Sequence, residues 1–250
     1  MKLALLSDLH ANLRAVQACV AHARDAGATQ FAVLGDIVGY GAEPGAVVDE
    51  VMQLAAQGAI VLRGNHDDAA VTPPAHAKNL EGASAKWTHR ELTAAQRGYL
   101  SSLPLTQRIG GSLLVHASAH EPARWNYVDN PHSAARCLEA AAQFEDVTEV
   151  FCGHVHEQRM FYRGRGRDPM PFVPVTAAPA CVPATRSWVA TVGSVGQPRD
   201  GDPRAMYALF DTAQSRLVFH RVPYDHTAAA EAVLRAGLPD SFARRLQEGR

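Results

Sequence analysis

The sequence predicts an α/β fold, and three features of its first 62 residues support that prediction. Short apolar runs at residues 3–6, 31–34 and 59–62 have the length of buried strands and are too short for interior helices. Amphipathic helical patterns separate these runs, as parallel β-α-β connections require. Each run is followed within two residues by Gly or Asp, and further Asp, Asn or His residues come next. Because the run at 3–6 is apolar on both faces, we expect it in the middle of a sheet that is covered on both sides.

The two helices between these strands have recognisable ends. In the first, Leu13, Val16 and Val20 recur on one face, and Gly27 ends the pattern. The second begins at Pro44 and is stopped by Gly58. The glycines of 35–41 allow sharp turns. They should leave Asp36 exposed at the sheet edge where the first strand also ends.

The middle of the chain predicts helices and loops around that sheet edge. Residues of about 68–105 are helical and polar, with Thr93 as the N-cap of a helix over 94–100. Strands are expected at 112–115 and 147–151. Between them, the segment 117–145 should form an ordered loop followed by a helix over 133–144. Long loops of this kind are usually functional.

Beyond residue 156 the pattern changes to antiparallel strands, expected at 158–162, 172–175, 188–192, 206–210 and 217–222 as a second sheet. Pro174 restricts the run at 172–175 to an edge or irregular strand. Helices at 227–236 and 241–247, within the C-terminal segment 226–250, close the chain, and the second should be capped by Asp240 or Ser241. No repeat or linker divides the sequence, so residues 1–250 are expected to form one domain.

Composition narrows the classes of function. The formal net charge is -1, which disfavours a duplex nucleic-acid binder. The basic residues of 163–167 therefore indicate a solvated turn. No apolar stretch approaches the roughly 20 residues that cross a bilayer, and the N-terminus does not have a signal-peptide pattern. The four cysteines are far apart and contain no Cys-x-x-Cys, so we expect reduced thiols and a cytoplasmic protein.

Polar side chains follow five of the expected strands. Asp8 and His10 come first, and residues two apart in a strand point the same way. Taken singly, each such residue is more simply a cap, a turn former or a core histidine. The complete set of strand-end residues is Asp8, His10, Asp36, Asn65, His66, His116, His154 and His156. Carboxylate, amide and imidazole ligands suit a pair of borderline divalent metals, which can activate water against a phosphate ester.

These residues lie in five sequence blocks that resemble the signature of the calcineurin-like metallophosphoesterase superfamily. The blocks are Asp8-x-His10, Gly35-Asp36-x-x-Gly39, Gly64-Asn65-His66-Asp67, His116 and Gly153-His154-x-His156, in the family's order, over residues 1–160. The resemblance implies a four-layer α-β-β-α sandwich of two mixed sheets flanked by helices. It also implies two divalent metal ions from among Mn, Fe, Zn, Ni and Co.

The same resemblance implies a role for each residue of the set. The first metal would be held by Asp8, His10, Asp36 and His156. The second would be held by Asp36, Asn65, His116 and His154, with Asp36 bridging the two. His66 would be no ligand. It would act as a general acid for the leaving group or as a donor to the transition-state oxygens.

Departures from the pattern narrow the subfamily. Protein serine/threonine phosphatases and related symmetric diadenosine tetraphosphatases carry Gly-Asp-x-x-Asp-Arg-Gly, whereas residues 35–41 here read Gly-Asp-Ile-Val-Gly-Tyr-Gly, without the arginine. Protein phosphatase activity is therefore disfavoured. The start Ser7-Asp-x-His-x-Asn12 and the stretch 193–199 resemble small bacterial phosphodiesterases of the YfcE-like group. His116 is followed by Ala117 rather than by the glycine of many relatives.

We therefore expect binuclear hydrolysis of a small phosphorylated substrate, a phosphodiester or a nucleotide-like phosphoanhydride. The alternatives are a small-molecule phosphomonoesterase, a nuclease acting on short oligonucleotides, and a non-catalytic scaffold with the same fold. Scaffold relatives typically lose metal ligands, and all are present here. Substrate contacts are expected from Asn12, His120, Tyr127 and Arg199, whereas Trp125 could equally be a core residue.

Overall fold

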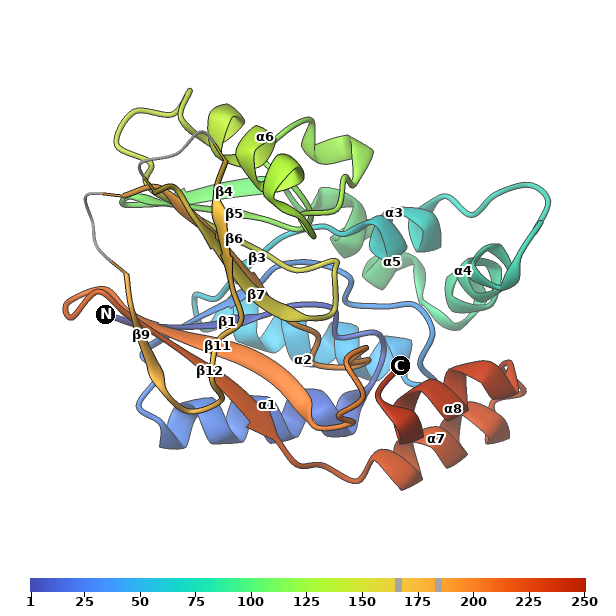
Figure 1. Ribbon diagram of the computed structural model, residues 1–250. Helices are drawn as coiled ribbons and strands as arrows, with labels where there is room; N and C mark the ends of the chain where they lie inside the picture. Colours follow the sequence, from blue (N-terminus) through green and yellow to red (C-terminus); the bar gives the residue numbers. More distant parts are fainter. Residues whose placement is uncertain (165–167, 183–185) are drawn as a thin grey trace.

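In the computed structural model, two six-stranded mixed sheets pack face to face, and helices cover both outer faces (Figure 1). The structure describes residues 1–164, 168–182 and 186–250, so the expected basic turn at 163–167 lies mostly outside the described residues. The α-β-β-α sandwich predicted from the sequence is confirmed. The chain forms four layers, in the order helices, sheet, sheet, helices.

The first sheet has the strand order β3-β2-β1-β11-β12-β9. Its strands are β1 (Lys2–Leu6), β2 (Gln30–Val33), β3 (Ile60–Val61), β9 (Pro179–Cys181), β11 (Ala205–Asp211) and β12 (Arg216–Val222). Strand β1 lies in the middle, parallel to β2 and antiparallel to β11. The expected central position of the first apolar run is therefore confirmed.

The second sheet has the strand order β4-β5-β6-β10-β7-β8. Its strands are β4 (Thr106–Ile109), β5 (Ser112–Val115), β6 (Glu149–Cys152), β7 (Gln158–Tyr162), β8 (Met170–Phe172) and β10 (Trp188–Val192). Strand β6 runs parallel to both β5 and β10, and β10 runs antiparallel to β7. The carboxyl ends of β5 and β6 therefore point to the same edge, and both are followed by predicted ligands.

The predicted division of strands between the sheets is wrong. We expected the strands at 188–192, 206–210 and 217–222 to form one sheet, but β10 joins the second sheet whereas β11 and β12 join the first. Strands β4 and β9 were not predicted. The strand expected at 172–175 ends at Phe172, and Val173 and Val175 are 74% and 67% exposed around Pro174, which cannot donate to a ladder.

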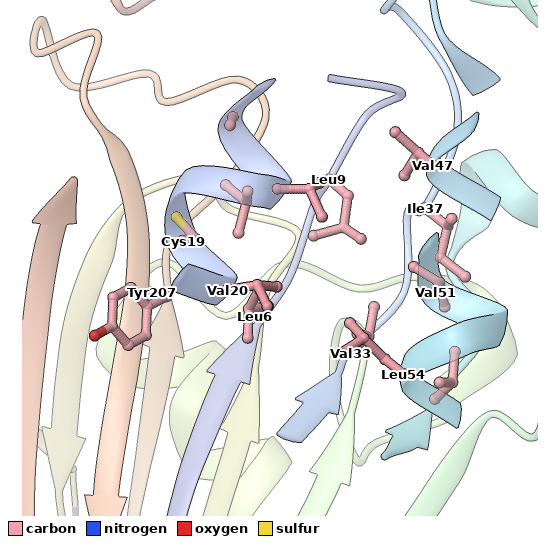
Figure 2. Close-up of a cluster of buried hydrophobic side chains, with 14 of the residues drawn as sticks. Leu6, Leu9, Cys19, Val20, Val33, Ile37, Val47, Val51, Leu54 and Tyr207 are labelled. Atoms are coloured by element: carbon pink, nitrogen blue, oxygen red, sulfur yellow. The ribbon is translucent and has the colours of Figure 1, made fainter. Parts of the chain in front are cut away.

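Alternate side chains of β1 are buried in two different hydrophobic cores. Leu3 and Leu5 point into the core between the sheets, whereas Ala4 and Leu6 point into the core beneath the helices. Figure 2 shows Leu6 among buried side chains of the flanking helices. Burial of one leucine stabilises the fold by about 1.5–3 kcal/mol. Both faces of β1 thus fix it at the centre and hold its carboxyl end in place.

Helices cover the outer faces as follows. In Figure 1, α1 (Leu13–Asp25) and α2 (Pro44–Ala56) lie against the first sheet and α6 (Pro131–Ala141) against the second. The remaining helices are α3 (Asn65–Val71), α4 (Leu80–Glu91), α5 (Ala94–Ser102), the 3₁₀ turn Pro122–Arg124, α7 (His226–Arg235) and α8 (Asp240–Glu248). Thr93 caps α5 as expected. Helix α8, in contrast, has Pro239 at its N-cap position, without a side-chain cap.

The C-terminal helices have a defined place. Helices α7 and α8 pack against each other and form an apolar cluster with Tyr40, which lies in the loop after β2. Both lie at the same end of the sandwich as α3 and α4 (Figure 1). In the described part of the chain, no helix combines the length and the apolar character that a membrane span needs. Cys19, Cys137 and Cys152 are free and buried.

Candidate metal centre

The predicted ligands lie in turns just beyond the strands rather than in the strands themselves. Strand β1 ends at Leu6, and Asp8 and His10 follow with left-handed φ values of 54° and 46°. The argument from strand alternation is therefore wrong for this pair, because a coiled turn aims both side chains. Asp36 (51°), His154 (66°) and His156 (63°) share the left-handed conformation. Such conformations cost about 1–3 kcal/mol each and cluster at functional sites.

Backbone hydrogen bonds between the turns hold this strained geometry. The amide of Asp8 donates to the carbonyl of Gly35 at 3.0 Å, and the amide of His10 donates to the carbonyl of Asp36 at 3.0 Å. The amide of His154 donates to Oδ2 of Asp8 at 2.9 Å. The turns after β1, β2 and β6 thus support one another, although they are far apart in sequence.

Two glycines allow the turns to approach this closely. A Cβ atom on Gly153 would lie 1.8 Å from Oγ of Ser7 and 2.4 Å from Oδ2 of Asp8. A Cβ atom on Gly64 would lie 2.2 Å from Oδ1 of Asp36. Neither contact can be relieved without moving a carboxylate. Both glycines of the sequence motifs are therefore required by packing around the predicted ligands.

The first group of side chains consists of Asp8, His10 and His156, all buried. Nδ1 of His10 donates to the carbonyl of Val38 at 3.2 Å, and Nδ1 of His156 donates to the carbonyl of Gln197 at 2.7 Å. The two Nε2 atoms face each other at 3.1 Å. Oδ1 of Asp8 lies 3.2 Å from Nε2 of His156 and, although buried, accepts no hydrogen bond.

The second group consists of Asp36, His116 and His154, with Asn65 beside them. Nδ1 of His116 donates to the carbonyl of Leu34 at 2.8 Å, which turns Nε2 toward the group. That atom lies 3.1 Å from Oδ1 of Asn65 and 3.2 Å from Nδ1 of His154. Potential ligand atoms thus converge on one point from different elements.

Asp36 lies between the two groups. Its Oδ1 atom accepts a hydrogen bond of 2.8 Å from the backbone amide of His66. Its Oδ2 atom is buried without a hydrogen-bond donor. That oxygen is 3.4 Å from Nε2 of His116 and 3.9 Å from Nε2 of His10. Asp36 is thus the one member of the set whose carboxylate faces both groups.

Burial and mutual charge shift the titration of these side chains. Burial strongly lowers the pKa of His10, and burial together with the charge of His116 lowers the pKa of His154 to about 4. Burial would raise the pKa of Asp8, but the neighbouring His156 outweighs it and holds this pKa below its usual range. Burial would also lower the pKa of His116, but the carboxylate of Asp36 raises it to about 9.

The donor set fits two divalent cations. Buried carboxylate oxygens without hydrogen-bond donors are unfavourable, and so are deprotonated ring nitrogens that face one another. Positive charge between these atoms removes the repulsion. A hydrogen bond from Nδ1–H to a carbonyl is the arrangement that fixes the orientation of a metal-binding imidazole ring. Mixed imidazole and carboxylate ligands suit borderline metals such as Mn, Fe, Co, Ni and Zn. Asp8, His10 and His156 would hold one ion and Asn65, His116 and His154 the other, with Asp36 facing both.

His66 lies beside the groups without joining either. It is the second residue of α3, and its ring packs against Tyr40 and His10 with centroid distances of 4.5 and 5.1 Å. Burial lowers its pKa, and the carboxylate of Asp36 opposes that effect. Asn65 and His66 line a cavity of about 220 Å³, and Glu81 is another of its lining residues. This position suits a group that contacts substrate rather than metal.

The four predicted substrate contacts fall in different environments. Tyr127 is half exposed and stacks on His154 at 4.1 Å, and His120 lines a nearby cavity of about 160 Å³ with Arg136. Arg199 lies against the ring of Tyr40. Asn12, in contrast, is buried and caps α1 through Oδ1, while its amide nitrogen donates to the carbonyl of Gly196 at 2.9 Å. The fold therefore uses the polar atoms of Asn12 internally.

Two residues at the site were not predicted. Asp67 is buried, and its carboxylate accepts hydrogen bonds from the amides of Ile37, Val38 and Gly64. Burial and the charge of Asp36 raise its pKa to about 7. Tyr40 has φ of 62° and touches His10, His66 and Phe242. Asp67 belongs to a motif block and Tyr40 directly follows one, but their roles depend on contacts with other turns.

The chain is similar in sequence and in structure to known proteins. The sequence-family model of the calcineurin-like phosphoesterase superfamily domain matches residues 1–215 of the chain. The chain belongs to this superfamily. A crystal structure of a metallophosphoesterase from Sphaerobacter thermophilus is 35% identical, with a TM-score of 0.87, over 100% of this chain and 99% of that one. The superfamily inferred from the sequence motifs is therefore confirmed.

Two archaeal relatives extend over the same length. An uncharacterized protein of Methanocaldococcus jannaschii is 29% identical over 99% of this chain and 98% of its own length. The crystal structure of a hypothetical protein from Pyrococcus horikoshii has a TM-score of 0.76 at 20% identity, covering 100% of this chain and 98% of that one. These similarities extend through the C-terminal helices, beyond the motif blocks.

Proposed function

We propose that this protein is a binuclear, metal-dependent phosphoesterase that cleaves a phosphodiester or a nucleotide-like phosphoanhydride. The observation that carries the proposal is the pair of ligand groups, each with acceptor atoms converging on one point, on either side of Asp36. Two divalent ions there would supply Lewis-acid charge and acidify a water molecule for attack on phosphorus. Free buried thiols agree with a reducing compartment, so we place the reaction in the cytoplasm.

The side chains of the protein have separate tasks in this reaction. Val38, Leu34 and Gln197 fix three imidazole rings through their carbonyls, so that the ligand atoms need no reorganisation during turnover. His66 would assist departure of the leaving oxygen. Since burial lowers its pKa, His66 is neutral near pH 7 and acts there as an N–H donor to the developing charge.

Two cavities beside the ligands favour a diester or anhydride over a monoester. One cavity, of about 220 Å³, is lined in part by Asn65 and His66. The other, of about 160 Å³, is lined in part by Tyr127, which stacks on His154. A phosphorus atom with two organic substituents could place one in each cavity. A monoester would use one and leave the other filled with water.

A metal-reconstitution assay tests the proposal. The EDTA-stripped protein is given Mn²⁺, Co²⁺, Ni²⁺, Zn²⁺ or Mg²⁺ and assayed on bis-p-nitrophenyl phosphate and p-nitrophenyl phosphate. We expect at least one metal to restore cleavage, with a higher kcat/KM for the diester. A higher value for the monoester would support the phosphomonoesterase alternative. No cleavage of either ester by protein that holds two metal ions would support the scaffold alternative.

A further inference from the structure

Arg199 has hydrogen-bonding capacity that the fold does not use. Within the described part of the chain, no carboxylate lies within 4 Å of its guanidinium. Nη2 donates to Oε1 of Gln197 at 3.1 Å, and Nε is buried without an acceptor. Arg204 and Arg221, which lie close by, both pair with Asp202. A half-buried guanidinium with unused donors can bind an anion without breaking a contact of the fold.

The backbone ties Arg199 to the first ligand group. Its amide donates to the carbonyl of His156 at 3.3 Å, and the carbonyl of Gln197 accepts the Nδ1–H of His156. The connection between β10 and β11 therefore positions a metal-binding imidazole and a free cation at the same time. A shift of the backbone at residues 197–199 would therefore also disturb His156.

Two aromatic rings locate the guanidinium relative to both ligand groups. Its central carbon lies 5.7 Å from the ring centroid of Tyr40, and that ring packs on His10 at 4.8 Å. Burial raises the pKa of both Tyr40 and Tyr127, and the charge of Arg199 opposes the rise at both phenols. Because Tyr127 stacks on His154, Arg199 lies near the rings that flank the two groups.

A second guanidinium strengthens the positive potential at this position. Arg245, from α8, lies 5.6 Å from the same Tyr40 ring. Glu81 is the carboxylate at this ring, and it accepts a hydrogen bond of 3.0 Å from the Tyr40 hydroxyl. The guanidinium groups of Arg199 and Arg245 thus lie at the same ring, and the carboxylate of Glu81 there already accepts a hydrogen bond. The C-terminal helix contributes charge to the site as well as apolar packing.

We infer that Arg199 binds the non-bridging oxygens of the phosphoryl group at the metal centre, with Tyr40 as the surface that positions it. The inference rests on the proposed function and names the side chain that would hold the substrate anion. A guanidinium offers parallel N–H donors that match two oxygens of a phosphoryl group, and such charge-assisted pairs are about twice as strong as neutral ones. Tyr40 acts through Arg199 and is a positioning residue.

Binding of inorganic phosphate to the Mn²⁺-loaded protein, measured by titration calorimetry, tests this inference directly. Arg199→Ala should weaken phosphate binding by about 10- to 100-fold, and Arg199→Lys should lose less because it keeps the charge. Arg204→Ala is the matched control: it removes an arginine from the same loop, but one already paired with Asp202. It should bind phosphate within about twofold of the wild type. Metal content and melting temperature are measured for each variant.

The outcomes separate this inference from the proposed function. If Arg199→Ala and Arg199→Lys hold two metal ions and bind phosphate as tightly as the wild type, the inference is wrong, whatever the wild type hydrolyses. If the wild type cleaves neither ester but its phosphate binding depends on Arg199, the inference stands and the proposed reaction fails. If Arg199→Ala loses metal or folds poorly, the result for Arg199→Lys decides. A wild-type protein that holds two metal ions but binds no phosphate would overturn the inference, whereas the ester assay alone decides the proposed reaction.

Discussion

Nε2 of His10 and Nε2 of His156 lie 3.1 Å apart, and each ring directs its Nδ1 atom at a backbone carbonyl. Two neutral rings in this arrangement point lone pairs at each other in a buried position, which is unfavourable. The fold holds them there because β1, which precedes His10, is fixed in the first sheet, and the turn between β6 and β7, which carries His156, is fixed by the second. The unfavourable contact becomes favourable once positive charge lies between the rings.

Loss of metal should therefore lower stability. If the protein binds metal at 100 times its dissociation constant, each site adds about 2.7 kcal/mol to the free energy of unfolding. We expect EDTA to lower the melting temperature by several degrees and His156→Ala to lose about one equivalent of metal by elemental analysis. His76→Ala removes an exposed histidine and serves as the control. Unchanged melting after complete chelation would contradict the prediction.

Metal affinity should rise with pH. Nε2 of His116 must lose its proton before it can bind metal, and Asp36 raises the pKa of His116 to about 9. Below that pH a proton competes with the ion, so apparent affinity should increase by up to about tenfold per pH unit for the one proton displaced. Titration of the apoprotein with Mn²⁺ at pH 6, 7 and 8 measures this slope. A flat profile would show that His116 binds no metal.

Replacement of His66 should separate turnover from metal binding. His66 contributes to neither ligand group, so His66→Ala should keep both metal ions. If it assists the leaving group, kcat should fall by about 10²- to 10⁴-fold. Metal content and steady-state kinetics on the diester measure both effects. Equal activity in the variant would remove His66 from the mechanism.

Substitution of Gly153 should damage the site through packing alone. Gly153→Ala places a Cβ atom 2.4 Å from Oδ2 of Asp8, so we expect a loss of several kcal/mol in stability and weaker metal binding. Gly98→Ala is the matched control, because Gly98 lies inside α5 with nothing within 4 Å of the added atom. That variant should be more stable by up to about 1 kcal/mol. Chemical denaturation compares the two.

Local sequence patterns predicted much of the fold near the site. The central position of β1, the helices α1 and α2, and the Thr93 cap follow from apolar periodicity and capping residues within a few positions. The ligand blocks could be read because each follows a buried strand. Glycine within these blocks indicated close approach, and Gly64 and Gly153 have that role.

Long-range arrangements could not be read in the same way. Strands β10 and β11 are both buried runs, and nothing within either tells which sheet it joins, since that depends on partners such as β6 and β1 far away in sequence. The left-handed turn at Asp8 and His10 departs from strand geometry because Gly35 and Asp36 supply its hydrogen bonds. The role of Tyr40 likewise depends on α8, some 200 residues further on.

The place of β1 in its sheet also sets an order on synthesis and folding. Leu3 pairs with Phe210 and Leu5 with Ala208, so one edge of β1 has no partner until about 200 further residues have been synthesised. Contacts of such long sequence separation slow folding and expose strand edges to other chains. During this interval β1 can pair with β2 along one edge and pack against α1 on one face, while the edge that β11 later covers stays open.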